Sequence, residues 1–311
     1  MQNALLYLVT VLIWGSTWLA IEFQLGEVPV AVSLVYRFGL AALLLWAWCL
    51  LRRLPMRLPM SMHFCVALMA VLNFALNYYL LYQAQLYLTS AMAAIAFSTM
   101  LLMNIINTRL FFGQPVAKRI YVGAALGIGG IAVLFAPDLT GLSLANTSLL
   151  GLLLVLSGTL SASFGNMLSV RNSRRGIGIL PMNAWGMLYG TLALTALALL
   201  SGNTFVFSSQ PAYLWSLLYL SLFGTVIAFG TYFALLKRMG PEKASYTIVL
   251  FPLVAVLLST WFEGFQWQLS TLLGFALVLA GNALVLTPFH KLRQLLPGRK
   301  AAVVTVPYKG S

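Results

Sequence analysis

Ten long apolar runs follow one another along the chain and limit what it can fold into. A transmembrane helix needs about 20 mostly apolar residues, because a helix of that length crosses the hydrocarbon layer of a bilayer. Only short connections separate the runs. They cover residues 4–22, 30–51, 63–82, 86–110, 120–136, 148–170, 182–200, 213–236, 244–262 and 268–287. The sequence therefore predicts an all-α integral membrane protein with ten transmembrane helices and no inserted soluble domain.

The low content of charged residues agrees with a surface that faces lipid. Charged residues make up 7% of the chain, against roughly 25% in a soluble domain. The chain has two cysteines, Cys49 and Cys65, which cannot form a disulfide scaffold for a protein of this length. We expect both to be structural thiols.

The basic residues fall in alternate connections between the apolar runs. Arg37 is the one exception among the 18 Lys and Arg residues. The other connections contain Glu22, Glu27, Asp138 and Glu263 and no basic residue. By the positive-inside rule, this pattern predicts that both termini are cytoplasmic and that the number of spans is even. The net charge of +13 thus orients the protein in the membrane, and we expect no nucleic-acid partner because no contiguous basic face is present.

The two halves of the chain repeat each other. Adding 151 to the positions of three glycines in the first half gives three glycines in the second half. These pairs are Gly113 and Gly264, Gly123 and Gly274, and Gly130 and Gly281. The sequence therefore predicts a first five-helix repeat at 1–143, a second at 144–290 and a basic cytoplasmic tail at 291–311. Since five spans is an odd number, the repeats must have opposite orientations, which is a transporter architecture.

Several short motifs, in this order and spacing, resemble the EamA-type members of the drug/metabolite transporter superfamily. They are Trp14-Gly15-Ser16-Thr17-Trp18 in the first run, Ala244-Ser245, Pro252, and Glu263-Gly264 near the end. The first half departs from the pattern, because Phe112-Gly113 stands where the second half has Glu263-Gly264, and Leu101 stands where it has Pro252. The resemblance covers essentially the whole chain, and a salt-bridge role for that acid is retained only at Glu263.

Within the superfamily, the Trp- and Tyr-rich helices are most similar to the YddG-type bacterial amino-acid exporters. This resemblance implies a secondary transporter in the bacterial inner membrane that exports aromatic and other neutral amino acids by alternating access. It also implies a central cavity lined by helices 1–4 and 6–9, with helices 5 and 10 at the periphery. The alternatives are a drug or metabolite exporter of the same superfamily and, less favoured, a channel.

The chain lacks the motifs of an enzyme or of an ATP-driven pump. It contains no GxxxxGK[ST], HExxH or GxSxG motif, and its two histidines, His63 and His290, are too few for a metal site. We therefore expect no enzyme activity, no metal and no cofactor. No carboxylate lies in the middle of a span, although proton-coupled carriers usually have an ionisable residue there. This absence favours transport without tight proton coupling.

Arg37 lies about 10 Å inside one end of the second span, at 1.5 Å per residue. It could bind a substrate carboxylate, pair with Glu22 or Glu27 in an outer gate, or extend to the interface as long basic side chains do. A GxxxG pattern at Gly123 and Gly127 predicts close helix packing, either within a monomer or in a homodimer.

The other candidate site residues are polar or aromatic side chains within the spans. An amino acid needs donors and acceptors for its charged groups and an adaptable wall for its side chain. The candidates are Trp14, Thr17, Trp18, Arg37, Asn73, Asn77, Tyr78, Tyr82, Asn104, Ser163, Trp185, Tyr189 and Tyr232, with Pro252 as a hinge. Each of them could instead bond a neighbouring helix, and Tyr82 and Trp185 could belong to an interfacial aromatic belt. The expected partners are a small-molecule substrate, namely amino acids, and the lipid bilayer.

Overall fold

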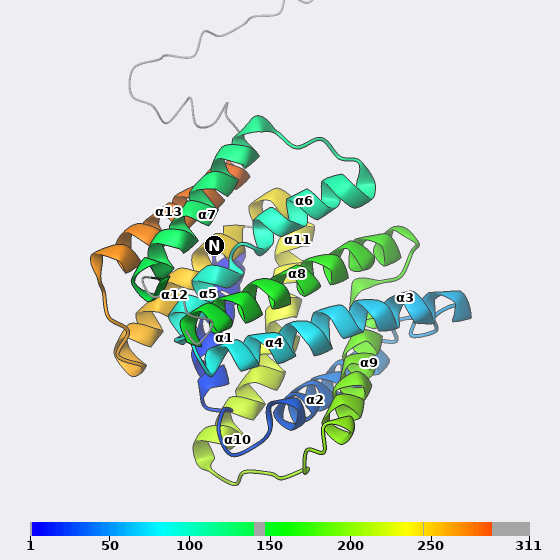
Figure 1. Ribbon diagram of the computed structural model, residues 1–311. Coiled ribbons are helices and arrows are strands. Elements are labelled where there is room, and N and C mark those ends of the chain that lie inside the picture. Colours follow the sequence, from blue (N-terminus) through cyan, green and yellow to red (C-terminus); the bar gives the residue numbers. More distant parts are fainter. Residues whose placement is uncertain (1, 140–146, 245, 288–311) are drawn as a thin grey trace, which may run out of the picture.

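The computed structural model describes residues 2–139, 147–244 and 246–287, and all regular structure in them is helical (Figure 1). The helices are α1 Gln2–Glu22, α2 Val30–Leu51, α3 Met60–Ala70, η1 Val71–Leu76, α4 Asn77–Gln85, α5 Ser90–Phe97, α6 Met100–Phe112, α7 Lys118–Leu139, α8 Thr147–Arg174, α9 Ile179–Leu200, α10 Pro211–Leu218, η2 Tyr219–Ile227, α11 Ala228–Ala244, α12 Tyr246–Phe262 and α13 Leu269–Leu286. Each predicted apolar run falls on one of these helices or on a consecutive set of them.

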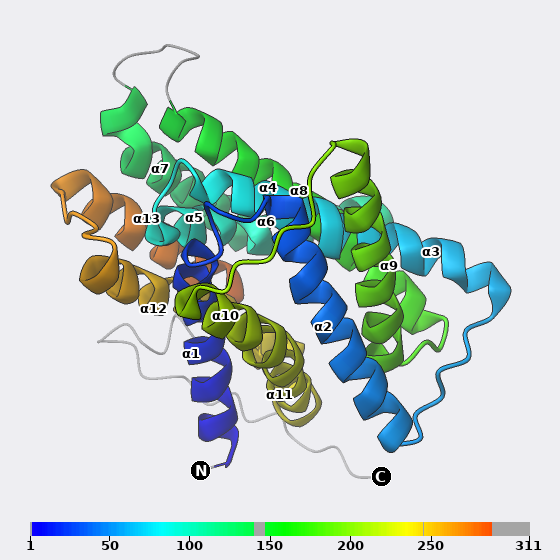
Figure 2. The ribbon, with the colours of Figure 1, turned by 90° about the horizontal axis from the view of Figure 1, so that it is seen from below.

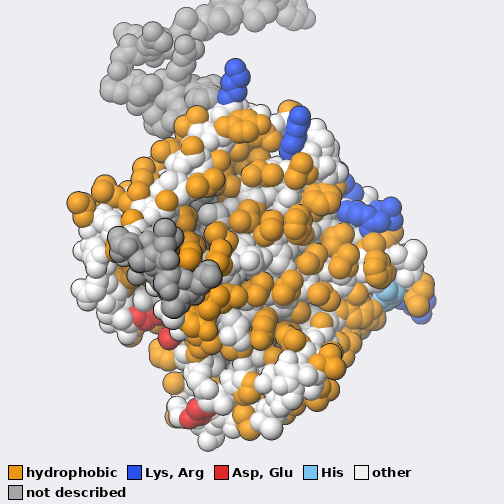
Figure 3. All heavy atoms as spheres, in the orientation of Figure 1, with side chains coloured by type: hydrophobic (Ala, Val, Ile, Leu, Met, Phe, Trp, Pro, Cys, Tyr) orange, Lys and Arg blue, Asp and Glu red, His pale blue; other side chains and the backbone are white. Residues whose placement is uncertain are grey.

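Eight helical segments in the described part of the chain are long and apolar enough to cross a membrane, and Thr247–Phe262 is a shorter apolar helix. Large apolar side chains are freely exposed, with Leu200 at 88% and Met60 at 87%. Figure 3 shows orange apolar side chains over most of the visible face, with Lys and Arg along its upper right and Asp and Glu at its lower left. The count of ten spans and the cytoplasmic position of the termini remain predictions.

The contacts between helices repeat from one half to the other. The helix α8, the first of the second half, contacts α4 and α6 of the first half, and the helix α1, the first of the first half, contacts α11 and α12 of the second half. Three pairs join equivalent helices of the two halves, namely α2 with α9, α5 with α12, and α7 with α13. Figures 1 and 2 show the α7–α13 pair and the α2–α9 pair on opposite sides of the molecule. The molecule is therefore built from two similar sets of helices around a pseudo-two-fold relation.

The repeated glycines meet each other where α7 packs on α13. A Cβ atom built on Gly123 would lie 2.7 Å from the carbonyl oxygen of Gly281, and one built on Gly130 would lie 2.7 Å from that of Gly274. The two helices run antiparallel here, because residue numbers on α13 decrease where those on α7 increase. The glycine pattern predicted from the sequence is thus used for close packing within one chain, since glycine lets two backbones approach.

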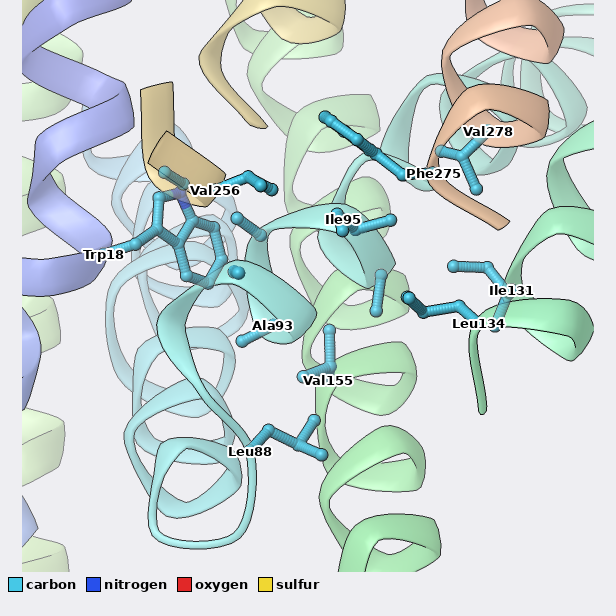
Figure 4. Packing of buried hydrophobic residues seen from close by; sticks show 14 of the residues in the cluster. Trp18, Leu88, Ala93, Ile95, Ile131, Leu134, Val155, Val256, Phe275 and Val278 are labelled. Carbon is cyan, nitrogen blue, oxygen red and sulfur yellow. The ribbon is translucent and has the colours of Figure 1, made fainter. Parts of the chain in front are cut away.

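The hydrophobic core next to these helices joins both halves. Figure 4 shows Trp18 of α1, Ile95 of α5 and Val155 of α8 in one cluster with Val256 of α12 and Val278 of α13. All of these side chains except Trp18 are at least 99% buried, and Trp18 is 6% exposed. The core therefore surrounds α5, which is held between the first helices of both repeats.

The fourth predicted span, 86–110, is not one continuous helix. A turn at Ser98 and Thr99 separates α5 from α6. The Ser98 hydroxyl donates to the Ile95 carbonyl at 2.7 Å, and that of Thr99 donates to the Ala96 carbonyl at 2.7 Å. Such local bonds compete with the helical ladder. The second half has Pro252 inside α12 near the equivalent place, so each repeat has a disturbance of the helical ladder in this span.

Two π-helical segments occupy equivalent places in the two repeats. Adding 151 to η1, Val71–Leu76, gives 222–227, which lies within η2, Tyr219–Ile227. In η1 the Leu72 carbonyl accepts a bond from the Ser161 hydroxyl of α8 at 2.9 Å, and in η2 the Leu220 carbonyl accepts one from the Thr225 hydroxyl at 2.8 Å. Hydroxyl groups thus satisfy carbonyls inside a membrane span where the ladder changes. π-Helical turns are frequently found at functional sites.

Candidate functional site

The two tryptophans of α1 form an aromatic wall between the repeats. The Trp14 ring lies 5.0 Å from that of Tyr232 and 5.8 Å from that of Phe229, both on α11. The Trp18 ring is stacked 6.1 Å from Phe251 of α12 and lies 5.2 Å from Phe97 of α5. The predicted candidates Trp14, Trp18 and Tyr232 therefore lie together on facing helices of the two halves.

Thr17 lies between these tryptophans and faces η2. Its hydroxyl donates to the Trp14 carbonyl at 2.7 Å. Its methyl carbon would be 2.8 Å from a Cβ atom at Gly224. Glycine at position 224 thus lets α1 approach η2 closely beside the aromatic wall.

Arg37 is fully inside the protein and does not extend to the interface. Its side chain is 1% exposed, and its Nη1 donates to the Tyr82 hydroxyl at 3.0 Å. The guanidinium carbon lies 4.8 Å from the centre of the Tyr78 ring, a cation–π distance. Within the described residues, Arg37 forms no ion pair with Glu22 or Glu27. The predicted candidates Arg37, Tyr78 and Tyr82 are therefore in direct contact, and the Tyr82 side chain is buried, unlike that of an interfacial belt residue.

Asn104 and Ser163 lie in a polar seam between α6 and α8. Asn104 accepts a bond from Asn166 at 3.3 Å, and the Ser163 hydroxyl accepts one from Asn107 at 2.8 Å. These bonds join the two helices. In this conformation both candidates bond a neighbouring helix.

Asn73 and Asn77 lie on the face of η1 and α4 that contacts α8. A Cβ atom at Gly165 of α8 would lie 2.5 Å from the Asn73 side-chain oxygen, and one at Gly158 would lie 3.1 Å from the Asn77 carbonyl. The Asn77 side-chain nitrogen donates to the Asn73 carbonyl at 3.3 Å. The predicted shared face is present, and it is the face on which the two helices pack.

Trp185 and Tyr189 belong to a separate aromatic cluster. The Tyr189 hydroxyl and His63 Nδ1 are 2.6 Å apart, and Trp185 Nε1 donates to the Met56 carbonyl at 2.8 Å. Trp185 also makes an edge contact with Trp46 at 4.8 Å. Met56 lies in the connection after α2 that contains the basic residues, so this cluster is at the end of the molecule predicted to be cytoplasmic. Within the described residues, Trp185 and Tyr189 make no ring contact or hydrogen bond with the tryptophans of α1.

Glu263, which follows α12, holds the first turn of α5. Its carboxylate accepts bonds from the Ser90 backbone nitrogen at 3.2 Å and from the Ser90 hydroxyl at 2.5 Å. A carboxylate at a helix N-terminus satisfies free N–H groups and interacts favourably with the helix dipole. The next residue, Gly264, has φ of +67°, as does Gly113 at the equivalent place, and glycine adopts this left-handed conformation without strain.

Sequence reasoning missed several residues that contact the candidates. The Tyr82 hydroxyl donates to Gln24 at 2.8 Å, and Gln85 donates to the Trp18 carbonyl at 3.0 Å. Gln85 follows Tyr82 by three residues and so shares its helix face, a spacing that could have identified it. Gln24 lies in a connection, where no periodicity applies.

An open apolar groove lies beside α1. Its volume is about 720 Å³, and α1, α2, α10 and η2 line it with side chains that include Phe23, Leu40, Trp215 and Tyr219. Trp215 is 72% exposed. The Tyr219 hydroxyl is 2.6 Å from that of Ser16 on α1, so a polar contact lies beside this groove.

Comparison with known proteins identifies a family. The model of the EamA-like transporter family matches twice, at residues 2–136 and 149–287. The inner membrane transporter YedA of Escherichia coli K12 is 30% identical over 277 residues, which are 86% of this chain and 87% of YedA. Protein PagO of Salmonella typhimurium is 25% identical, over 84% of this chain and 85% of PagO. The transporter YoaV of Bacillus subtilis is 23% identical, over 90% of this chain and 96% of YoaV.

A solved crystal structure of another protein has the same fold. It superposes with a TM-score of 0.67 at 18% sequence identity and covers 95% of this chain and 99% of its own.

Proposed function

Because the chain belongs to the EamA-like transporter family, we propose that it is a secondary transporter that exports aromatic and other neutral amino acids by alternating access. It is a multi-pass inner membrane protein, as its relative YedA is described to be. We propose further that it catalyses no chemical reaction and works without a cofactor. Family membership supports transport, and the nature of the transported molecule is our proposal.

The aromatic wall of α1 is the observation that carries the amino-acid proposal. Trp14 contacts Tyr232 of the second repeat, and Trp18 is stacked on Phe251 of the second repeat. Substrate sites in transporters with inverted repeats lie between the repeats. A wall of aromatic rings can accept apolar and aromatic side chains of different shapes, while the polar side chains around Arg37 supply donors and acceptors.

Counterflow in proteoliposomes tests this proposal. Purified protein is reconstituted in vesicles loaded with one unlabelled neutral amino acid, and uptake of a labelled one is followed. We expect saturable uptake that aromatic and other neutral amino acids inhibit, and empty vesicles are the control. Saturation together with counterflow also separates a carrier from a channel. If none of the amino acids competes, the substrate class is wrong.

The apolar groove favours a second candidate, the export of apolar drug-sized molecules that enter from the bilayer. Its volume of about 720 Å³ lies within the range of small-molecule sites. The same vesicles distinguish the two candidates when apolar amines are added as competitors. Inhibition by apolar amines, with no inhibition by amino acids, would favour the second candidate.

Transport is expected to continue without a pH gradient. The carboxylates of Glu22, Glu27 and Glu263 lie at the end of α1 or in connections, and not in the middle of a described span. Proton-coupled carriers usually have an ionisable residue inside the membrane. Uptake should therefore be the same before and after an ionophore collapses the pH gradient. A strict requirement for the gradient would contradict uncoupled transport while leaving the substrate class intact.

A further inference from the structure

A group of polar side chains around Arg37, which we name the Arg37 cluster, lies between α1, α2 and α4 of the first repeat. It consists of Glu22, Gln24, Arg37, Tyr82 and Gln85. Glu22 is the last residue of α1, Gln24 follows it in the connection, Arg37 lies on α2, and Tyr82 and Gln85 lie on α4. Arg37 and Tyr82 are at most 1% exposed, and Gln24 and Gln85 at most 3%. Glu22 is partly exposed, and its Oε2 atom is buried. Polar groups at such depth normally find hydrogen-bond partners.

Part of the Arg37 cluster is bonded internally. Arg37 donates to the Tyr82 hydroxyl at 3.0 Å, and this hydroxyl donates in turn to Gln24 Oε1 at 2.8 Å. Gln85 Nε2 donates to the Trp18 carbonyl at 3.0 Å. Trp18 lies one helical turn before Glu22, so Gln85 is bonded to the last turns of α1. These bonds fix the side chains and leave their other polar atoms unused.

Four buried atoms of the Arg37 cluster have no hydrogen-bond partner among the described residues. Two are donors, Arg37 Nε and Gln24 Nε2, and two are acceptors, Glu22 Oε2 and Gln85 Oε1. An unused polar atom in the interior costs about 1–3 kcal/mol, and more when it is charged. Asn77, Asn172 and Ser259 have one such atom each and lie on three different helices. The concentration of four in one cluster therefore calls for a ligand.

The charges in the Arg37 cluster are also unpaired. No carboxylate of the described chain lies within ion-pair distance of Arg37, which instead rests against the rings of Phe38 and Tyr78 at 5.4 and 4.8 Å. A buried cation without an anion is costly in a membrane. Glu22 Oε2 is a buried acceptor at the end of α1, two residues before Gln24. A molecule with one anionic and one cationic group would complement both charges.

We propose that the Arg37 cluster binds the α-carboxylate and α-ammonium groups of the transported amino acid. This inference rests on the proposed function. The carboxylate accepts from Arg37 Nε and Gln24 Nε2, and the ammonium donates to Glu22 Oε2 and Gln85 Oε1. Charge-assisted bonds of this kind are the stronger hydrogen bonds in proteins.

The position of the Arg37 cluster also gives the substrate side chain a direction. Gln85 bonds the backbone of Trp18, whose ring lies against Phe97 and Phe251. A substrate held by its charged groups near the end of α1 thus has the aromatic wall one or two turns away along the same helix. Because the cluster is closed to solvent in this conformation, the substrate reaches it when the end of α1 and α4 separate, as alternating access requires.

Two near-isosteric variants test the two halves of the cluster separately. Gln24→Glu keeps the oxygen that accepts from Tyr82 and replaces the free Nε2 donor by an anionic oxygen, which repels a carboxylate. Glu22→Gln keeps the shape of the side chain and removes the charge that attracts an ammonium group. Glu27→Gln is the control, because Glu27 lies outside the cluster and bonds Ser208 at 2.5 Å.

Counterflow is measured with an amino acid and with two inhibitors, the corresponding amine without a carboxylate and the corresponding acid without an amino group. In Gln24→Glu we expect inhibition by the amino acid and by the acid to weaken about 10- to 100-fold, with inhibition by the amine retained. In Glu22→Gln we expect the reverse: inhibition by the amine weakens, and inhibition by the acid is retained. Glu27→Gln should behave as wild type.

A purely structural role would lower protein yield or transport rate without this crossed pattern. If the wild type accepts amino acids while both variants change all inhibitors equally, or change none, the inference is overturned and the proposed function stands. If the wild type accepts no amino acid, the inference and the proposed function both fail. Thermal stability of each purified variant, measured in detergent with and without the amino acid, provides the readout if a variant no longer transports. Loss of stabilisation by the amino acid in Gln24→Glu and Glu22→Gln, but not in Glu27→Gln, supports binding, and full stabilisation in all three overturns it.

Discussion

Adding one methyl group at Gly130 and one at Gly281 should destabilise the packing of α7 on α13, whereas a methyl group at Gly129 should be tolerated. A Cβ atom at Gly281 would lie 2.6 Å from the Gly123 carbonyl oxygen, and one at Gly130 would lie 2.7 Å from that of Gly274. Both obstacles are backbone atoms, which cannot rotate away. Overpacking of this kind costs about 1–3 kcal/mol per site. We therefore expect the double variant Gly130→Ala/Gly281→Ala to be less stable than the wild type and than either single variant.

Gly129→Ala is a matched control on the same helix. No atom lies within 4 Å of a Cβ atom at Gly129, and alanine is the better helix former by about 1 kcal/mol. Thermal unfolding in detergent, followed by tryptophan fluorescence, gives the comparison. If the double variant unfolds at the temperature of the wild type, the close approach of α7 and α13 is not as described.

The second large effect is expected at Glu263. Glu263→Ala removes the carboxylate that accepts from the Ser90 nitrogen and hydroxyl and leaves a buried helix N-terminus without this partner. Losing a helix cap or a charged hydrogen bond costs about 1–3 kcal/mol. We expect a loss of about 2 kcal/mol in the stability of the protein, measured by unfolding in detergent.

Gln266→Ala is the control for Glu263, because the Gln266 side chain bonds only the Gly264 carbonyl of its own connection at 3.1 Å and is exposed. A double-mutant cycle with Ser90→Ala isolates the contact with the hydroxyl, because alanine keeps the backbone nitrogen that also donates to Glu263. If Glu263→Ala and Ser90→Ala have additive effects, the carboxylate does not act through the Ser90 hydroxyl.

Sequence patterns predicted the helices because apolar runs of membrane length leave few alternatives. Each of the ten runs falls on helical segments, and the spacing of 151 residues placed Gly123 and Gly130 on the helix that meets Gly274 and Gly281. Those predictions depend on the length of the apolar runs and on the positions of glycines, and both can be read directly from the sequence. The family comparison supports the same two-repeat organisation.

The interruptions of the helices could not be predicted in the same way. Nothing in the run 86–110 distinguishes Ser98 and Thr99 from hydroxyl residues that remain inside a regular helix, because such side chains often bond carbonyls without breaking the ladder. The π-helical turn of η1 likewise depends on a neighbouring helix, since Ser161 of α8 supplies the bond to the Leu72 carbonyl. The Ser98 hydroxyl also accepts a bond from Asn282 of α13 at 3.1 Å, so contacts between distant segments take part in both features.

Only part of the candidate site could be predicted, because the contacts of its side chains also depend on distant segments of the chain. Trp14 and Trp18 were recognised by residue type, and their aromatic partners on α11 and α12 confirm that they lie between the repeats. The sequence leaves three alternatives open for Arg37, and its burial excludes extension to the interface. Gln24 was missed because a residue in a connection has no periodic position. The assignment of these side chains to substrate binding stays a prediction.

The glycines between α7 and α13 restrict how far the two halves of the gene can diverge. Gly123 lies against Gly281, which is the counterpart of Gly130 in the second half. Gly130 lies against Gly274, which is the counterpart of Gly123. A duplicated segment normally accumulates substitutions independently of its copy. Here a larger residue in one copy would collide with the other copy, so selection acts on the four positions together and preserves at this contact the likeness of two segments that are otherwise free to drift apart.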